Sequence, residues 1–136
     1  MDETSTIWSV IHRHLKSVFD GDSQTYIETT AEDLSLFEWW VTPHRQDGLD
    51  FHRFMIDHSW AGTQRDYRYD LLEPRVQLYG DTAIVSYTFM LSTARPEGGV
   101  DHRTHNESRV LIKRNGQWQI VHVHKSPAWQ APFEPK

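Results

Sequence analysis

The chain has 136 residues, a formal net charge of -5 and no cysteine, with 38% hydrophobic and 24% charged residues. This length and composition predict one globular domain over residues 1–136 and argue against a disordered chain. The acidic balance argues against a nucleic-acid-binding protein, and the lack of cysteine excludes disulfides and thiol chemistry. Neither a secretory signal nor an apolar run long enough to span a membrane is present. We therefore expect a soluble cytoplasmic protein.

Three helices are predicted in the first half of the chain. Residues 4–19 place large apolar side chains on one stripe at helical spacing, and Thr4 or Ser5 could cap the start. A shorter helix is predicted over residues 23–32, and a third, which contains His52, over residues 49–60.

The remaining elements are predicted strands. Residues 34–41, LSLFEWWV, read as one aromatic strand that Thr42-Pro43 ends. Four further strands are predicted over residues 67–79, 82–93, 102–113 and 117–125. Helices followed by a meander of strands predict an α+β fold with a curved antiparallel sheet. Residues 126–136 are expected to form a proline-rich tail that wraps the surface or frays.

Both faces of the predicted sheet carry apolar residues. The strand over residues 82–93 places Tyr87 and Phe89 on one face, with Ile84 and Met90 on the other. Helices can cover only one of these faces. The second face therefore predicts a homo-oligomer formed through the sheet.

Asn115-Gly116 between alternating apolar segments predicts a hairpin. A two-residue turn would place Arg109 opposite His122, whereas a bulge at Gly116 would shift the pairing by one residue. We favour the bulge because it makes one face mostly apolar. Arg109 and Lys125 then face inward, and the opposite face presents Trp118, Ile120, His122 and His124 to a partner subunit.

An inward Arg109 needs an anionic partner, because a lone buried cation is very unfavourable. That partner could be an internal salt bridge to Glu38 or Glu107 alone, or a ligand anion bound alongside such a bridge, with Tyr87 and Phe89 nearby. His122 and His124 could form part of a zinc site with a third ligand such as His105, but interface histidines are the simpler interpretation. Neither a metal nor a cofactor is predicted.

Three segments carry a family resemblance. GLDFHRFMIDHSW (48–60), YDLLEPRVQLYGDTAIVSY (69–87) and ESRVLIKRNGQWQIVHVHKSPA (107–128) resemble the association, or hub, domain of calcium/calmodulin-dependent protein kinase II. The resemblance covers nearly the whole chain and implies the NTF2-like cone that SnoaL-like cyclases and ketosteroid isomerases share. No kinase motif is present, so a stand-alone hub-like domain is expected.

The resemblance also implies an internal pocket that binds small carboxylates. Its histidine corresponds to His52 and one of its arginines to Arg109. A second arginine is Lys125 here, which keeps the charge without the planar fork, and a third is Phe89. These changes favour a more apolar ligand.

Two functions follow from these residues. The preferred one is a non-catalytic, oligomerising module that holds a small carboxylate, with Trp39 among the pocket residues. The alternative is a SnoaL-like isomerase, cyclase or dehydratase in which His52 or Glu38 moves a proton. Aromatic surroundings would raise the pKa of Glu38 and suit it to that role.

Overall fold

The computed structural model describes residues 2–58 and 66–128. In chain order the elements are α1 (Glu3–Asp20), α2 (Ser23–Thr29), β1 (Thr30–Glu38), β2 (Thr42–Asp47), α3 (Asp50–His58), β3 (Tyr67–Tyr79), β4 (Thr82–Ala94), β5 (Val100–Arg114) and β6 (Gln117–Pro127). The predicted α+β class is confirmed. Among these described residues, no helix is both long enough and apolar enough to cross a membrane.

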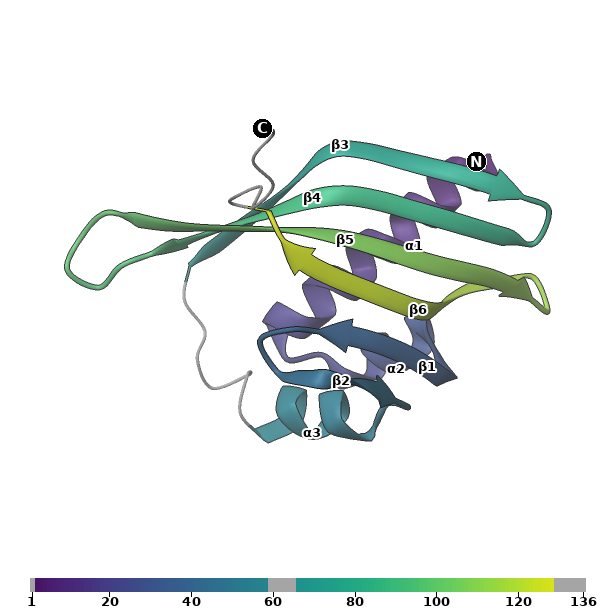
Figure 1. Cartoon of the computed structure of the whole chain (residues 1–136), viewed down its shortest axis with the longest axis horizontal. Coiled ribbons are helices and arrows are strands. Elements are labelled where there is room, and N and C mark those ends of the chain that lie inside the picture. Colours follow the sequence, from purple (N-terminus) through teal and green to yellow (C-terminus); the bar gives the residue numbers. More distant parts are fainter. Residues whose placement is uncertain (1, 59–65, 129–136) are drawn as a thin grey trace, which may run out of the picture.

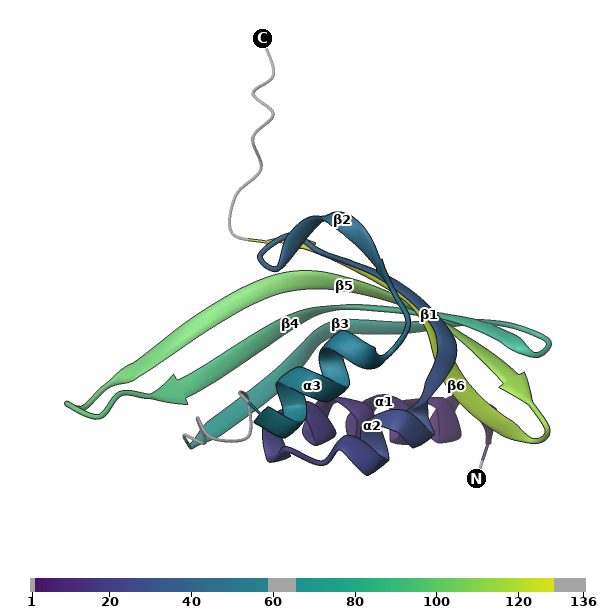
Figure 2. The same cartoon turned by 90° about the horizontal axis from the view of Figure 1, so that it is seen from below.

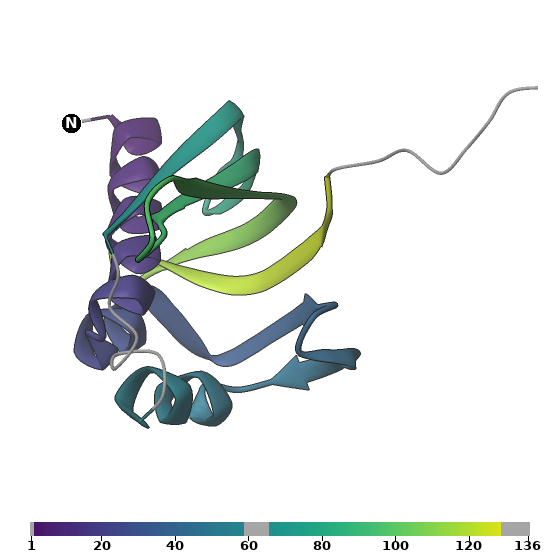
Figure 3. The same cartoon turned by 90° about the vertical axis from the view of Figure 1, so that its left-hand side faces the viewer.

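The strands form one curved sheet in the order β2-β1-β6-β5-β4-β3. Strands β1 and β6 run parallel, and the other neighbouring pairs are antiparallel, so the sheet is mixed rather than wholly antiparallel. The three helices lie on the concave side (Figures 1 and 3). Figure 2 shows the convex side without a helix over it in the described part of the chain.

Helix α1 has a clear start and a clear end. The Asp2 side chain accepts a hydrogen bond of 2.7 Å from the backbone N–H of Ser5, so Asp2 is the N-cap in place of the predicted Thr4 or Ser5. Gly21 ends the helix in the left-handed conformation, with φ 70°. Ile7 and Ile11 on its apolar stripe are fully buried in the core.

The region between α2 and α3 differs from the prediction. Helix α2 ends at Thr29, and β1 begins at Thr30. Pro43 does not end a strand but lies in β2, at the edge of the sheet, where its missing N–H is tolerated. As a result Trp39 and Trp40 lie in the turn between two strands and not inside one strand.

The hairpin between β5 and β6 has a two-residue turn. Asn115 and Gly116 have φ of 53° and 76°, and Arg114 pairs with Gln117. Two positive φ values are those of a type I′ turn, so the predicted bulge at Gly116 is wrong.

The irregularity lies inside the strands instead. Val110 pairs with His122 but Leu111 pairs with Ile120, which leaves Val121 as an extra residue in β6. On one side of this bulge Arg109 pairs with Val123, the register that was predicted.

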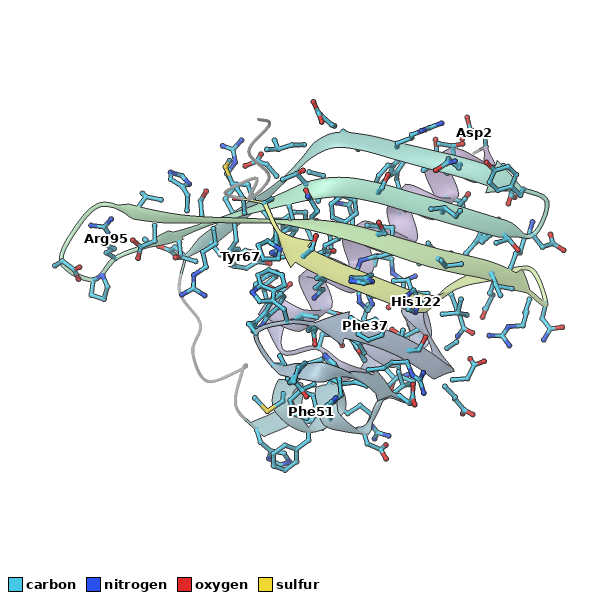
Figure 4. All side chains as sticks on the ribbon, in the orientation of Figure 1. Asp2, Phe37, Phe51, Tyr67, Arg95 and His122 are labelled. Atoms are coloured by element: carbon cyan, nitrogen blue, oxygen red, sulfur yellow. The ribbon has the colours of Figure 1, made fainter. Side chains whose placement is uncertain are left out.

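The bulge corrects the predicted interface. Trp118 and Ile120 are only 4% and 0% exposed and belong to the core, so they cannot face a partner subunit. The extra residue reverses the alternation between the two halves of β6. His122 and His124 stay on the convex face, and Figure 4 shows His122 beside Phe37 of the neighbouring strand, their rings 6.4 Å apart.

Two predictions extend into residues that lie outside the described ranges. The third helix is described only as far as His58, so its predicted last two residues lie outside. The predicted tail starts within β6, which continues to Pro127, and residues 129–136 also lie outside the described residues.

Candidate functional site

A cavity of about 790 Å³ lies between the helices and the concave face of the sheet. This volume is typical of small-molecule pockets. Most of the lining is apolar or aromatic and includes Leu15, Phe19, Trp39, Trp40, Phe89 and Leu91. A cluster of charged side chains interrupts this lining.

The first charged group centres on Glu38. Because β1 and β6 run parallel, Glu38 pairs with Lys125, and Nζ of Lys125 donates to Glu38 Oε2 at 2.8 Å. His52 from α3 places Nε2 at 2.7 Å from the other oxygen, Oε1. The ammonium of Lys125 also lies 5.1 Å from the centre of the Trp40 ring.

The second charged group centres on Glu107, which alternates with His105 and Arg109 on the inner face of β5. Arg109 donates to Glu107 Oε1 from Nε at 3.0 Å and from Nη2 at 2.8 Å. Tyr87, the cross-strand neighbour of Glu107, donates its hydroxyl to the same oxygen and accepts from Arg109 Nε at 2.9 Å. His105 Nε2 lies 2.6 Å from Glu107 Oε2.

Each carboxylate is therefore shared between one permanent cation and one histidine. Burial alone would raise the pKa of Glu38, but the hydrogen bond from His52 and the charge of Lys125 lower it to about 2. The predicted rise in this pKa is wrong for that reason. Burial likewise opposes ionisation of Glu107, yet Arg109 and Lys125 hold its pKa well below the usual range.

The pKa values of Arg109 and Tyr87 are both raised, so both side chains stay protonated. Burial would lower the pKa of Arg109, but Tyr87 and Glu107 raise it above the ordinary value. Burial raises the pKa of the Tyr87 hydroxyl, which stays protonated and can donate. The charged end of the cavity thus holds two carboxylates against two cations, all at most 15% exposed.

The structure brings together the residues that the sequence singled out. Arg109, Lys125, His52, Glu38, Trp39 and Phe89 line the cavity. Tyr87 contacts the charged end through Glu107 and Arg109.

Sequence reasoning did not assign Trp40, His14 or His105 to the pocket, although all three line it. A signal for His105 was present, since residues 105, 107 and 109 alternate on one strand face. His105 is also on the opposite face from His122 and His124, so it cannot complete a zinc site with them. No group of metal ligands occurs within the described ranges.

His14 is a buried histidine of α1 beside this cluster. Its Nδ1 lies 3.0 Å from Thr29 Oγ1 and 3.2 Å from Thr30 Oγ1. Burial, together with the charges of Arg109 and Lys125, holds its pKa well below the ordinary 6.5.

The low pKa of His14 predicts acid sensitivity. Below pH 6.5 the unfolded chain takes up a proton at His14 that the folded chain does not. Protonation therefore favours the unfolded state, and the free energy of unfolding, which is at its full value above pH 6.5, decreases as pH falls. Between pH 6.5 and 5 the loss from His14 should reach about 2 kcal/mol in the free energy of unfolding. Urea unfolding of wild type and His14→Gln measures it, with His44→Gln, at an exposed position of the edge strand, as the control. An equal loss in His14→Gln would assign the effect to other groups.

The chain matches the protein family described as calcium/calmodulin dependent protein kinase II association domain over residues 3–129. It is 28% identical over 130 residues to the calcium/calmodulin-dependent protein kinase type II subunit delta of Oryctolagus cuniculus. That alignment covers 95% of this chain and 24% of the kinase, so the chain spans about a quarter of the length of this relative.

Solved structures of similar fold also match the chain. The association domain of C. elegans CaMKII superposes with a TM-score of 0.82 at 29% identity, covering 91% of this chain and 95% of that chain. An NTF2-like superfamily protein from Salmonella enterica superposes with a TM-score of 0.72 at 24% identity, covering 96% and 94%. The latter likeness shows the fold alone, which is NTF2-like as predicted.

Proposed function

The chain belongs to the calcium/calmodulin-dependent protein kinase II association-domain family, and we propose that it assembles with copies of itself and binds a small, largely apolar carboxylic acid in its cavity. The two parts of this function use opposite faces of the sheet.

The convex face is the surface proposed for self-association. Ile84, Val110 and His122 form a continuous row across β4, β5 and β6. Described helices cover only the concave face, so this row of half-buried side chains has no layer over it (Figures 2 and 3). A second copy is the expected partner, because the matching solved domain is described as an association domain.

Light scattering tests the assembly. Wild type should exceed the 16.1 kDa of one chain at micromolar concentration. Ile84→Glu should shift the protein towards the monomer, since it places a charge in the centre of the proposed interface. Ser9→Glu, on an exposed position of α1, is the control and should leave the mass unchanged. A wild-type monomer would refute this part of the proposal.

Arg109 carries the proposal of ligand binding. Glu107 and Tyr87 use its Nε and Nη2, whereas Nη1 has no hydrogen-bond partner among the described residues. Arg109 lines the cavity, so Nη1 can donate to a ligand carboxylate. The aromatic and aliphatic walls, which include Phe89, suit an apolar ligand body.

Thermal shift with a panel of aromatic carboxylic acids tests ligand binding. An acid present at about 100 times its Kd should stabilise wild type by about 2.7 kcal/mol. Arg109→Lys keeps the charge next to Glu107 but lacks the second donor group, so we expect its Kd to be at least about tenfold higher. Arg114→Lys, at an exposed position of the same strand and outside the cavity, is the matched control. If no acid stabilises wild type, the binding proposal fails.

One observation favours acid–base catalysis as a second candidate function. Glu38 and His52 form a carboxylate–histidine pair at 2.7 Å inside the cavity, and such a pair can accept a proton from a substrate. Glu38 occupies Nε2 of His52, and Nδ1 of His52 is fully buried, so the ionised carboxylate of Glu38, whose pKa is about 2, would be the proton acceptor while His52 orients it. Loss of deuterium from α-deuterated aryl ketones, followed by NMR, should then depend on Glu38.

A further inference from the structure

Building on the proposed acid-binding function, we propose that His105 is a second recognition residue for the ligand carboxylate, and that it takes up a proton as the acid binds. The ligand would then lie between Arg109 and a protonated His105, and its binding would be coupled to one proton.

The first step is the position of His105. Its side chain is 14% exposed, and the residue lines the cavity. Its ring lies 5.1 Å from the ring of Phe89, and 5.8 Å and 5.3 Å from Trp39 and Trp40. Aromatic side chains from β4 and the β1–β2 turn therefore surround the imidazole and can also hold the apolar body of a ligand.

The second step is the proton already on the ring. Nε2 of His105 lies 2.6 Å from Glu107 Oε2, and a carboxylate only accepts, so Nε2 carries a hydrogen. In the neutral ring Nδ1 then presents a lone pair. Within the described residues, Nδ1 has no hydrogen-bond partner.

The third step is the charge around the site. Arg109 shares Glu107 with His105, and the remaining pair of buried charges is Glu38 with Lys125. The two carboxylates and two cations cancel, so these four buried groups supply no net charge to hold an added anion. The other titratable or charged groups that line this cavity are His52, His14, Tyr26, Tyr67, His102 and Arg103.

A proton on Nδ1 of His105 removes two obstacles to binding an anion: the lone pair on Nδ1 and the lack of a net positive charge among the buried groups. It converts a lone pair that would repel a carboxylate into an N–H that donates to it, and it supplies one positive charge. The proton comes from solvent or from the acid itself, and no covalent bond between protein and ligand forms or breaks. Glu107, which accepts from Nε2, stabilises the imidazolium.

His52 is the less suitable proton acceptor for the ligand. Its Nδ1 is fully buried, so a ligand in the cavity cannot reach it, whereas Nε2 is occupied by Glu38. His14 faces Thr29 and Thr30 and is held neutral by its burial. Of the three buried or half-buried histidines of the cavity, His105 alone combines a carboxylate partner with a ring nitrogen that a ligand can reach.

Calorimetry with 2-naphthoate as the probe tests the proposal. Titrations at pH 8 in buffers of different ionisation enthalpy count the protons taken up, and we expect close to one per ligand on wild type. The Kd should rise towards about tenfold per pH unit at the alkaline end of the range from pH 6 to 8. The amide 2-naphthamide needs no proton, so its Kd should not vary with pH.

His105→Gln should bind 2-naphthoate more weakly, without proton uptake and with a Kd independent of pH. Gln can still donate to Glu107, which preserves the local structure. His44→Gln, at an exposed position outside the cavity, should behave as wild type.

The possible outcomes separate the two proposals. If wild type binds 2-naphthoate with no proton uptake at pH 8, the His105 proposal is overturned while the binding function stands, and this measurement needs no variant. Proton uptake that persists in His105→Gln overturns the assignment to His105. If no aromatic acid, 2-naphthoate included, binds at any pH, the binding function itself fails.

Discussion

Replacing Arg109 with methionine should lower the free energy of unfolding by about 3–5 kcal/mol, because Glu107 would keep its charge inside the protein without the cation that neutralises it. The two side chains are only 3% and 2% exposed, so water cannot replace the lost partner. Urea unfolding at pH 7, at one fixed chain concentration, measures the effect.

The chain offers a matched control for this substitution. Arg45 and Asp47 are also two residues apart on one strand and also 2.8 Å apart, but they are 58% and 63% exposed. Arg45→Met should leave the unfolding midpoint almost unchanged, since solvent screens an exposed pair. The contrast isolates burial as the cause.

A second substitution tests whether the unpaired charge of Glu107 causes the loss of stability. Adding Glu107→Gln to Arg109→Met removes the stranded charge while keeping hydrogen-bonding groups for Tyr87 and His105. The double variant should therefore be more stable than Arg109→Met alone. If the second change instead causes further loss, Glu107 is not the source of the instability.

Trp118→Ala should also cost about 3–5 kcal/mol of unfolding free energy, because it removes a large core side chain. Trp118 is 4% exposed, and its indole Nε1–H donates to Glu3 Oε2 at 2.8 Å, which ties β6 to the start of α1. Trp40→Ala, at a position that is 51% exposed, should have a far smaller effect on unfolding.

The same variant separates a core role from an interface role. If Trp118 faced a partner subunit, its loss would weaken assembly and leave the fold of the single chain intact. Chemical denaturation combined with light scattering distinguishes the two cases. A folded Trp118→Ala monomer of unchanged stability would contradict the placement of Trp118 in the core.

The charged end of the cavity could be predicted only in part. Arg109 was expected to face inward with an anionic partner, and Glu107 was one of two carboxylates considered. The contact between Lys125 and Glu38 joins residues 87 positions apart. It depends on the parallel pairing of β1 with β6, which local patterns do not encode. For the same reason the fall in the pKa of Glu38 was not predicted: a hydrogen bond from His52 had been considered, but the contact with Lys125 had not.

By itself, the sequence determined the class of fold, the helix α1, the positions of most strands, and the hairpin at Asn115-Gly116. These features depend on periodicity and turn chemistry, which act between residues close together in the chain. Only the tertiary structure decided the faces of β6. The extra residue Val121 places Trp118 and Ile120 in the core while His122 stays outside, and no local pattern marks it, because packing against α1 and β1 selects where a strand bulges.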